Sequence, residues 1–189
     1  MEIIKASIDG LVVIQPKVYE DERGYFMESF KESFIEEHFP NIHFLQENES
    51  KSSFGVLRGL HFQKPPFEQT KLVRVIRGEV LDVAVDIRKD SPSFGKWESI
   101  ILSEKNKRQF YIPRGFAHGF VVLSEEAIFS YKVDNIYSPR DEGCIRYDDS
   151  DLNIDWKINT TLIKVSEKDN PMLNDKIKSI KELRDQQRV

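Results

Sequence analysis

The stretch that decides the fold reads Pro113-Arg114-Gly115-Phe116-Ala117-His118-Gly119-Phe120. A Pro-Gly turn opens it, because proline fixes one backbone angle and glycine accepts the conformations that other residues avoid. The apolar run that follows the turn is typical of a buried strand, and one histidine, His118, lies on it. The stretch therefore predicts a turn followed by an apolar strand that carries a histidine.

Strand patterns dominate the chain on both sides of this stretch. Between 71 and 87 apolar residues alternate from Leu81 onward, while Asp82 and Asp86 share the other face, which predicts a half-buried strand. Similar runs occupy 11–14, 25–30, 97–102, 109–112, 119–123 and 127–133, each near Gly, Pro, Asp or charged turn residues. Many short strands at this spacing predict an antiparallel sandwich or barrel.

Helices are expected to be few and peripheral. The segment 31–38 places Phe34 and Ile35 among charged residues, and 175–187 places Ile177, Ile180 and Leu183 at helical spacing. We therefore expect an all-β antiparallel sandwich or barrel with a few short peripheral helices. With 189 residues and no linker-like stretch, the sequence predicts a single domain over 1–189.

Composition narrows the class of function. The 28 basic and 32 acidic residues are interspersed and give a net charge of -4, which disfavours binding of nucleic acid through a basic face. The N-terminal residues lack the apolar run of a signal peptide, and no stretch approaches the ~20 apolar residues of a membrane span. We expect a soluble cytoplasmic protein with no membrane partner.

The 113–120 stretch resembles the second sequence motif of the cupin barrels, and this resemblance implies an all-β, cupin-like antiparallel jelly-roll barrel with a few short peripheral helices. In metal-dependent cupins its histidine joins a His-x-His pair from an earlier hairpin, whereas the earlier segment here reads His61-Phe62-Gln63. Two plausible histidine ligands are fewer than such sites usually require, so we expect no metal and no cofactor. Without a metal, histidines in a barrel are suited to proton transfer near neutral pH. A metal-dependent cupin oxygenase stays an alternative.

Further polar residues fit proton transfer. Arg58 precedes His61, Lys71 opens the next strand, and Tyr131 and Tyr137 follow His118 along the chain. Positive groups beside a histidine suit an anionic substrate or a developing enolate.

Six motifs in order carry a more specific resemblance. They are Asp21-Glu22-Arg23-Gly24-Tyr25-Phe26, Gln46-Glu47-Asn48, Leu57-Arg58-Gly59-Leu60-His61-Phe62-Gln63, Val85-Asp86-Ile87-Arg88 with Ser91-Pro92-Ser93-Phe94-Gly95, Pro113 to Phe120, and Tyr131. Together they resemble the dTDP-4-dehydrorhamnose 3,5-epimerase family from about Glu20 to about Pro171. The resemblance implies that the substrate is dTDP-4-dehydro-6-deoxy-glucose, whose ketone at carbon 4 acidifies the hydrogens on carbons 3 and 5.

The resemblance also implies roles for named residues. His61 matches the base, Tyr131 the acid, Lys71 the cation that stabilises the enolate, and Asp169 the carboxylate that orients the base. Substrate-binding positions match Arg23, Glu28, Gln46, Asn48, Arg58, Lys71, His118, Tyr137, Glu142 and Lys168, with Tyr137 stacking on the thymine. The family is dimeric with exchanged N-terminal strands, so we expect a homodimer in which Arg23 or Glu28 completes the partner's site.

One detail conflicts with ideal strand geometry, since strict alternation sends Arg58 and His61 to opposite faces. A bulge at Gly59 is expected to relieve the conflict, because glycine in a strand often marks one. Three further alternatives stay open: an epimerase that acts on one carbon, a ketoisomerase on a related dTDP-sugar, and a non-catalytic barrel that binds a nucleotide sugar.

Overall fold

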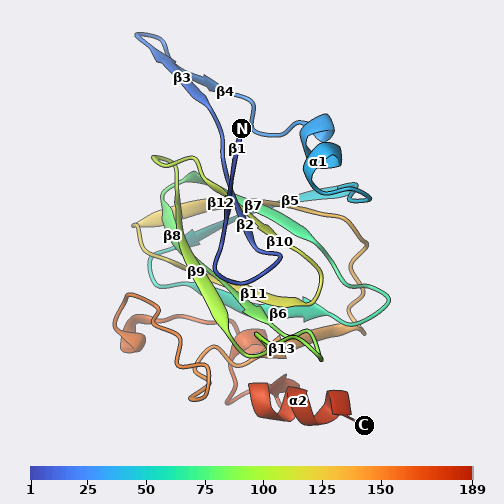
Figure 1. The fold of residues 1–189 in the computed structure, drawn as a ribbon. Coiled ribbons are helices and arrows are strands. Elements are labelled where there is room, and N and C mark those ends of the chain that lie inside the picture. The colour runs from blue at the N-terminus through green and yellow to red at the C-terminus, as the bar shows by residue number, and fades with distance from the viewer. Residues whose placement is uncertain (189) are drawn as a thin grey trace.

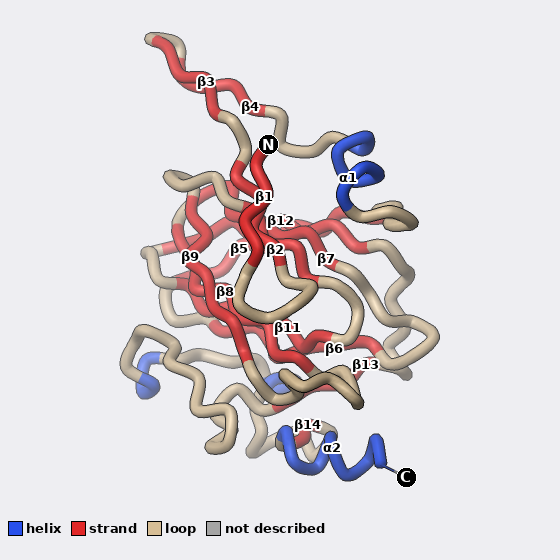
Figure 2. The backbone as a smooth tube through the Cα atoms, viewed as in Figure 1, coloured by secondary structure: helices blue, strands red, loops and turns tan. Residues whose placement is uncertain are grey.

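The computed structural model describes residues 1–188, which form two six-stranded sheets, a separate hairpin and two short α-helices (Figures 1 and 2). The first sheet has the order β1 (Glu2–Lys5), β2 (Val12–Gln15), β10 (Gln109–Ile112), β7 (Lys71–Arg77), β12 (Glu126–Val133) and β5 (Gln46–Ser53). The second has the order β14 (Ile177–Lys178), β13 (Glu142–Ile145), β6 (Leu57–Gln63), β11 (Phe116–Val122), β8 (Glu79–Asp86) and β9 (Trp97–Ser103). Only the β13–β14 pairing among these described strands is parallel. The predicted cupin-like jelly roll is confirmed.

The space between the sheets holds the main core. Phe110, Phe120 and Phe129 lie at its centre and are almost fully buried. Val73 from the first sheet and Ala84 from the second pack against them. The predicted stretch 113–120 turns at Gly115, whose φ is +84°, and runs into β11, which pairs with β6 on one side and β8 on the other. His118 therefore lies in the middle of the second sheet.

The outer face of the second sheet carries another core, and here one expectation is wrong. Strand β8 is buried on both faces, whereas the alternation predicted a half-buried strand. Leu81 and Val85 pack outward against Trp156 of the C-terminal segment and against α2 (Ile180–Arg188), which lies below this sheet in Figure 1. The carboxylates of Asp82 and Asp86 are buried on the other face, where hydrogen bonds and ion pairs compensate them.

The predicted helices are partly confirmed. Helix α1 (Glu32–His38) forms where expected, whereas the C-terminal helix begins at Ile180 rather than at 175. Ile177 instead lies in β14, which pairs with β13. Ile180 and Leu183 are buried as the helical spacing predicts, and through them α2 contributes to the outer core instead of lying loosely at the surface.

The strands β3 (Val18–Asp21) and β4 (Gly24–Met27) form a hairpin that projects away from both sheets (Figures 1 and 2). Its aromatic side chains Tyr19, Tyr25 and Phe26 are 54%, 55% and 66% exposed. Solvated aromatic residues on a projecting hairpin are unusual, since burying a side chain of this size is strongly favourable.

Candidate active site

A cavity of about 410 Å³ lies between the two sheets and collects most of the predicted site residues. The first sheet contributes side chains from β5, β7 and β12, and the second contributes side chains from β6, β11 and β13. The predicted residues that line the cavity are Gln46, Asn48, Arg58, His61, Lys71, His118, Tyr131, Tyr137, Glu142, Lys168 and Asp169.

His61 reaches this cavity through an irregularity in β6. The pairing of β6 with β11 matches His61 with His118 but then shifts its register before the next pair, Arg58 with Phe120. Gly59 lies in the shift with φ of +133°, and a Cβ there would lie 2.5 Å from the Cα of Gly119. Two glycines thus allow the backbones to approach closely, and both Arg58 and His61 line the cavity.

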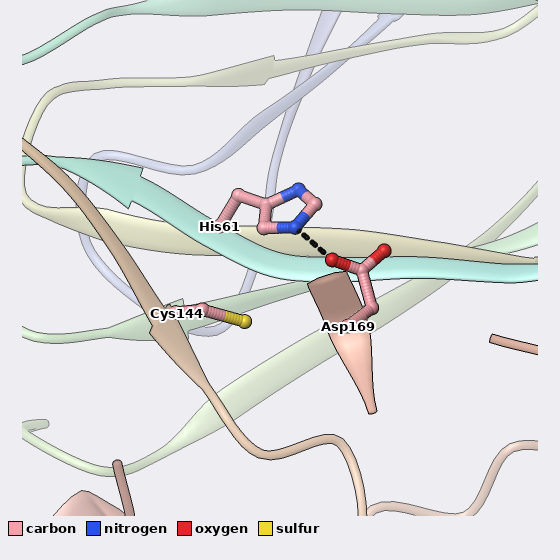
Figure 3. Close-up of side chains that lie close together, drawn as sticks. All are labelled: His61, Cys144 and Asp169. Atoms are coloured by element: carbon pink, nitrogen blue, oxygen red, sulfur yellow. Dashed lines mark hydrogen bonds and ion pairs between the residues drawn. The ribbon is translucent and has the colours of Figure 1, made fainter. Parts of the chain in front are cut away.

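Asp169 is hydrogen-bonded to His61. It lies in the short 3₁₀-helix η2 (Glu167–Asp169), and its Oδ1 is 2.6 Å from Nε2 of His61 (Figure 3). Burial alone would raise the pKa of Asp169, but the hydrogen bond from His61, together with the charges of His61 and Lys168, outweighs burial, and the pKa is lowered. An ionised carboxylate only accepts, so the imidazole proton is held on Nε2 and Nδ1 keeps its lone pair.

His118 has a second buried carboxylate as its partner. Both oxygens of Asp82 lie 3.0 Å from Nε2 of His118, and neither side chain is accessible to more than a trace of solvent. Burial lowers the pKa of His118, which favours the neutral ring. Lys71 is close enough to feel the charge of Asp82, yet burial lowers the pKa of Lys71 to about 8.

Tyr131 lies on the wall that faces His61, because it belongs to β12 of the first sheet. It is the direct cross-strand partner of Asn48, and burial raises its pKa, so its hydroxyl keeps its proton. Arg58 donates from Nε to the hydroxyl of Ser52 at 3.1 Å, which holds the guanidinium in place beside the cavity.

Three charged or aromatic residues form a further cluster on the cavity wall. Glu142 accepts from the hydroxyl of Tyr137 at 3.1 Å and from Nζ of Lys168 at 2.7 Å. Tyr137 is 49% exposed, and Nζ of Lys168 lies 6.0 Å from the centre of its ring.

Two predicted residues lie elsewhere in the chain. Arg23 is at the tip of the β3–β4 hairpin, where it pairs with Asp21, and Glu28 follows β4 and lies 3.8 Å from Lys31. Neither lines the cavity of its own chain.

Asp82, the partner of His118, is a residue to which neither a motif nor the resemblance gave a role. A signal was present, because an aspartate on an apolar strand must find a partner if both faces of that strand are buried. Gln69 and Ser166 also line the cavity, and nothing in their local sequence marks them.

The fold and the cavity define an acid–base enzyme on a cupin-like barrel: two histidines with carboxylate partners, a lysine with a lowered pKa and a protonated tyrosine share one cavity. A family model described as dTDP-4-dehydrorhamnose 3,5-epimerase matches residues 5–175. The chain belongs to this family, and it is an isomerase.

Individual relatives agree with this assignment. The dTDP-4-dehydrorhamnose 3,5-epimerase of Methanothermobacter thermautotrophicus is 53% identical over 168 residues, 88% of this chain and 90% of the relative. A solved dTDP-6-deoxy-D-glucose-3,5-epimerase from Legionella pneumophila, in complex with dTDP-4-keto-L-rhamnose, is 49% identical with a TM-score of 0.88 and 96% of each chain covered. A 3'-monoepimerase from Streptomyces bikiniensis, in complex with dTDP-quinovose, is similar at 29% identity and a TM-score of 0.83, covering 93% of this chain and 86% of the monoepimerase.

Proposed function

We propose that this protein converts dTDP-4-dehydro-6-deoxy-glucose to dTDP-4-dehydro-L-rhamnose by inverting carbons 3 and 5. The observation that carries the proposal is the placement of His61 and Tyr131 on opposite sheets that enclose one cavity. Inversion needs a base on one face of the sugar ring and an acid on the other.

His61 is the proposed base. The ketone at carbon 4 acidifies the neighbouring C–H bonds, and the lone pair on Nδ1 removes one of these protons while the bond electrons form an enolate. Asp169 holds the other ring nitrogen, so the imidazolium that forms keeps its orientation and gains a compensating charge. Lys71 is the proposed partner of the enolate oxygen, because a cation that lines the cavity acts strongly on charge that develops beside it.

Tyr131 is the proposed acid. It returns a proton to the opposite face of the same carbon, which restores the ketone and inverts the centre. The tyrosinate then regains a proton and His61 loses one, so no net proton is consumed. The raised pKa of Tyr131 supports this direction of transfer, since the hydroxyl is protonated at the start of the cycle.

The remaining cavity residues suit a nucleoside diphosphate sugar. Arg58 and Lys168 supply positive charge for the diphosphate, and the half-exposed Tyr137 suits stacking on the pyrimidine. A neutral His118 that donates from Nε2 to Asp82 has Nδ1 left to accept from a sugar hydroxyl. Gln46 and Asn48 add amide groups to the same wall.

We further propose a cytoplasmic homodimer in which the β3–β4 hairpins are exchanged. The exposed Tyr25 and Phe26 support this arrangement, because a second copy would bury them. Exchange would also bring Arg23 or Glu28 to the partner's cavity, although both lie away from their own. Among the described residues, no helix is long and apolar enough to cross a membrane. Light scattering after size exclusion tests the dimer, and a monomer for the parent protein would refute it.

Proton NMR in deuterated water tests the reaction. We expect deuterium to appear at carbons 3 and 5 together with the dehydrorhamnose product. Exchange at one carbon only would indicate a single-carbon epimerase, and binding without exchange would indicate a non-catalytic barrel. Either result would refute the double epimerisation.

Matched variants separate chemistry from folding. Tyr131→Phe and His61→Asn are expected to lose turnover while they still bind dTDP. The controls are Tyr147→Phe, in the outer core, and His38→Asn, exposed in α1, and both should keep turnover. Equal activity in a site variant and its control would refute the assigned role.

A further inference from the structure

Cys144 lies directly across from the proposed base. In the pairing of β13 with β6 its cross-strand partner is His61, so the two side chains project from neighbouring positions on one face of the sheet. Asp169 approaches the same point from η2. Ligand atoms of these three side chains, an imidazole nitrogen, the Cys144 Sγ and a carboxylate oxygen, all lie within 4.8 Å of one another (Figure 3).

The chemistry of the three donors points to one class of ion. Zn²⁺ binds imidazole nitrogen at ~2.0–2.1 Å, thiolate sulfur at ~2.3 Å and carboxylate oxygen at ~2.0–2.2 Å, and three protein ligands with an open fourth position are sufficient for it. A thiolate disfavours Mg²⁺ and Ca²⁺, which prefer oxygen ligands. For the pair of His61 and Asp169 the spacing is close to what Zn²⁺ needs, because their 2.6 Å contact has only to widen to roughly 3.3 Å.

We propose that His61, Cys144 and Asp169 form an inhibitory binding site for Zn²⁺ that overlaps the proposed catalytic base. Binding at the site depends only on these three side chains. The inhibition rests on the proposed function, because it requires His61 to be the base.

The proton balance explains why a bound ion would inhibit. Zn²⁺ replaces the proton on the Cys144 thiol, which leaves to solvent, and it takes the lone pair of Nε2 in place of the Nε2 proton. A neutral imidazole that binds a metal through Nε2 carries its one proton on Nδ1. The nitrogen that removes the substrate proton has then lost its lone pair.

Cys144 is partly exposed and lines a second cavity of about 680 Å³, which shares Glu142 and Lys168 with the first. In the absence of metal, burial raises the pKa of Cys144 to about 12, so the thiol is protonated and a poor nucleophile. A bound metal would have to displace this thiol proton, because the thiolate is the ligand.

One other group of residues needs a control. The exposed side chains of Glu32, Glu36 and His43 also lie within 4.8 Å of one another and could hold Zn²⁺ at the surface. The tests therefore use the full chain without a histidine tag, carrying His43→Asn as the background for every variant.

The first measurement is a calorimetric titration of the chelator-stripped protein with Zn²⁺. We expect one ion per chain, and at least about tenfold weaker binding after Cys144→Ser, which removes the sulfur but keeps a similar shape. With Co²⁺ as the probe, a sulfur-to-metal charge-transfer band should appear in the parent and be absent from Cys144→Ser. No binding to the His43→Asn background, or equal affinity with no such band, would overturn the site.

Turnover with increasing Zn²⁺ is the second measurement. Cys144→Ser should match the parent without metal and require at least about tenfold more Zn²⁺ for half inhibition. Zinc that binds through Cys144 without slowing turnover would overturn the inhibition while the site itself stood. An enzyme that is inactive before any metal is added would refute the proposed function, and the calorimetric result would still decide the site.

Discussion

Replacing Asp86 by Asn should test how the fold compensates a buried charge. The Asp86 carboxylate is fully buried and accepts from the Arg88 guanidinium at 2.7 and 3.0 Å and from the hydroxyls of Ser91 and Ser93 at 2.6 Å. Burial alone would raise the pKa of Asp86, but these hydrogen bonds outweigh it and lower the pKa to about 2. Asp86 and these three partners form a structural cluster away from the cavity residues.

The size of the effect follows from this pKa. A fall from 3.8 in the unfolded chain to about 2 in the fold is worth about 2 kcal/mol of stability at neutral pH. Because the folded pKa is the lower one, this stability is present above pH ~4 and is lost as the pH falls, about 1 kcal/mol of it by pH ~3. Asp86→Asn should cost about 3 kcal/mol at neutral pH, since it leaves Arg88 without its partner.

Urea unfolding followed by tryptophan fluorescence measures both quantities. The gap between parent and variant should shrink by about 1 kcal/mol between pH ~6 and pH ~3. Asp148→Asn is the matched control, because Asp148 also pairs with an arginine two residues away but is 42% exposed. It should cost less than about 1 kcal/mol. A gap that is constant with pH, or equal costs for the two variants, would refute the reasoning.

Three further predictions concern the site. Asp169→Asn should lower kcat by about 10²–10⁴-fold with KM little changed, because an amide no longer fixes the tautomer of His61; steady-state kinetics with unchanged kcat would contradict this. The rate should fall above pH ~8 as Lys71 loses its proton, since the pKa of Lys71 is about 8. Lys71→Arg should move this fall to higher pH, and a fall at the same pH in the variant would belong to another group. Gly59→Ala should cost more than about 2 kcal/mol in urea unfolding because its Cβ would meet Gly119, and a smaller cost would show that β6 can relax.

Alternation of apolar residues was a sufficient signal for some of the strands. It located β10 at its observed bounds and β12 within one residue, because both have apolar side chains at regular positions in a buried sheet. The same signal missed β5, whose sequence Gln46–Ser53 is polar throughout. This strand is held by its eight-residue pairing with β12, a tertiary effect that no local pattern reports.

The candidate site, like the strands, could be predicted only in part. The motif resemblance brought together residues far apart in sequence, such as His61 and Asp169, and the structure places them in contact. It assigned nothing to Cys144, because the register of β13 against β6 decides which side chain lies opposite His61. Burial of both faces of β8 was also beyond local reasoning, since it depends on a segment more than 60 residues further along the chain.

The position of Asp169 also sets an order of events during synthesis. Every other cavity residue on the sheets emerges from the ribosome before η2, so the barrel can close around His61 while its orienting carboxylate is still missing. A nascent chain at that stage would have a binding cavity and an unoriented base. Full activity would then begin only when the segment that carries Asp169 docks on the second sheet.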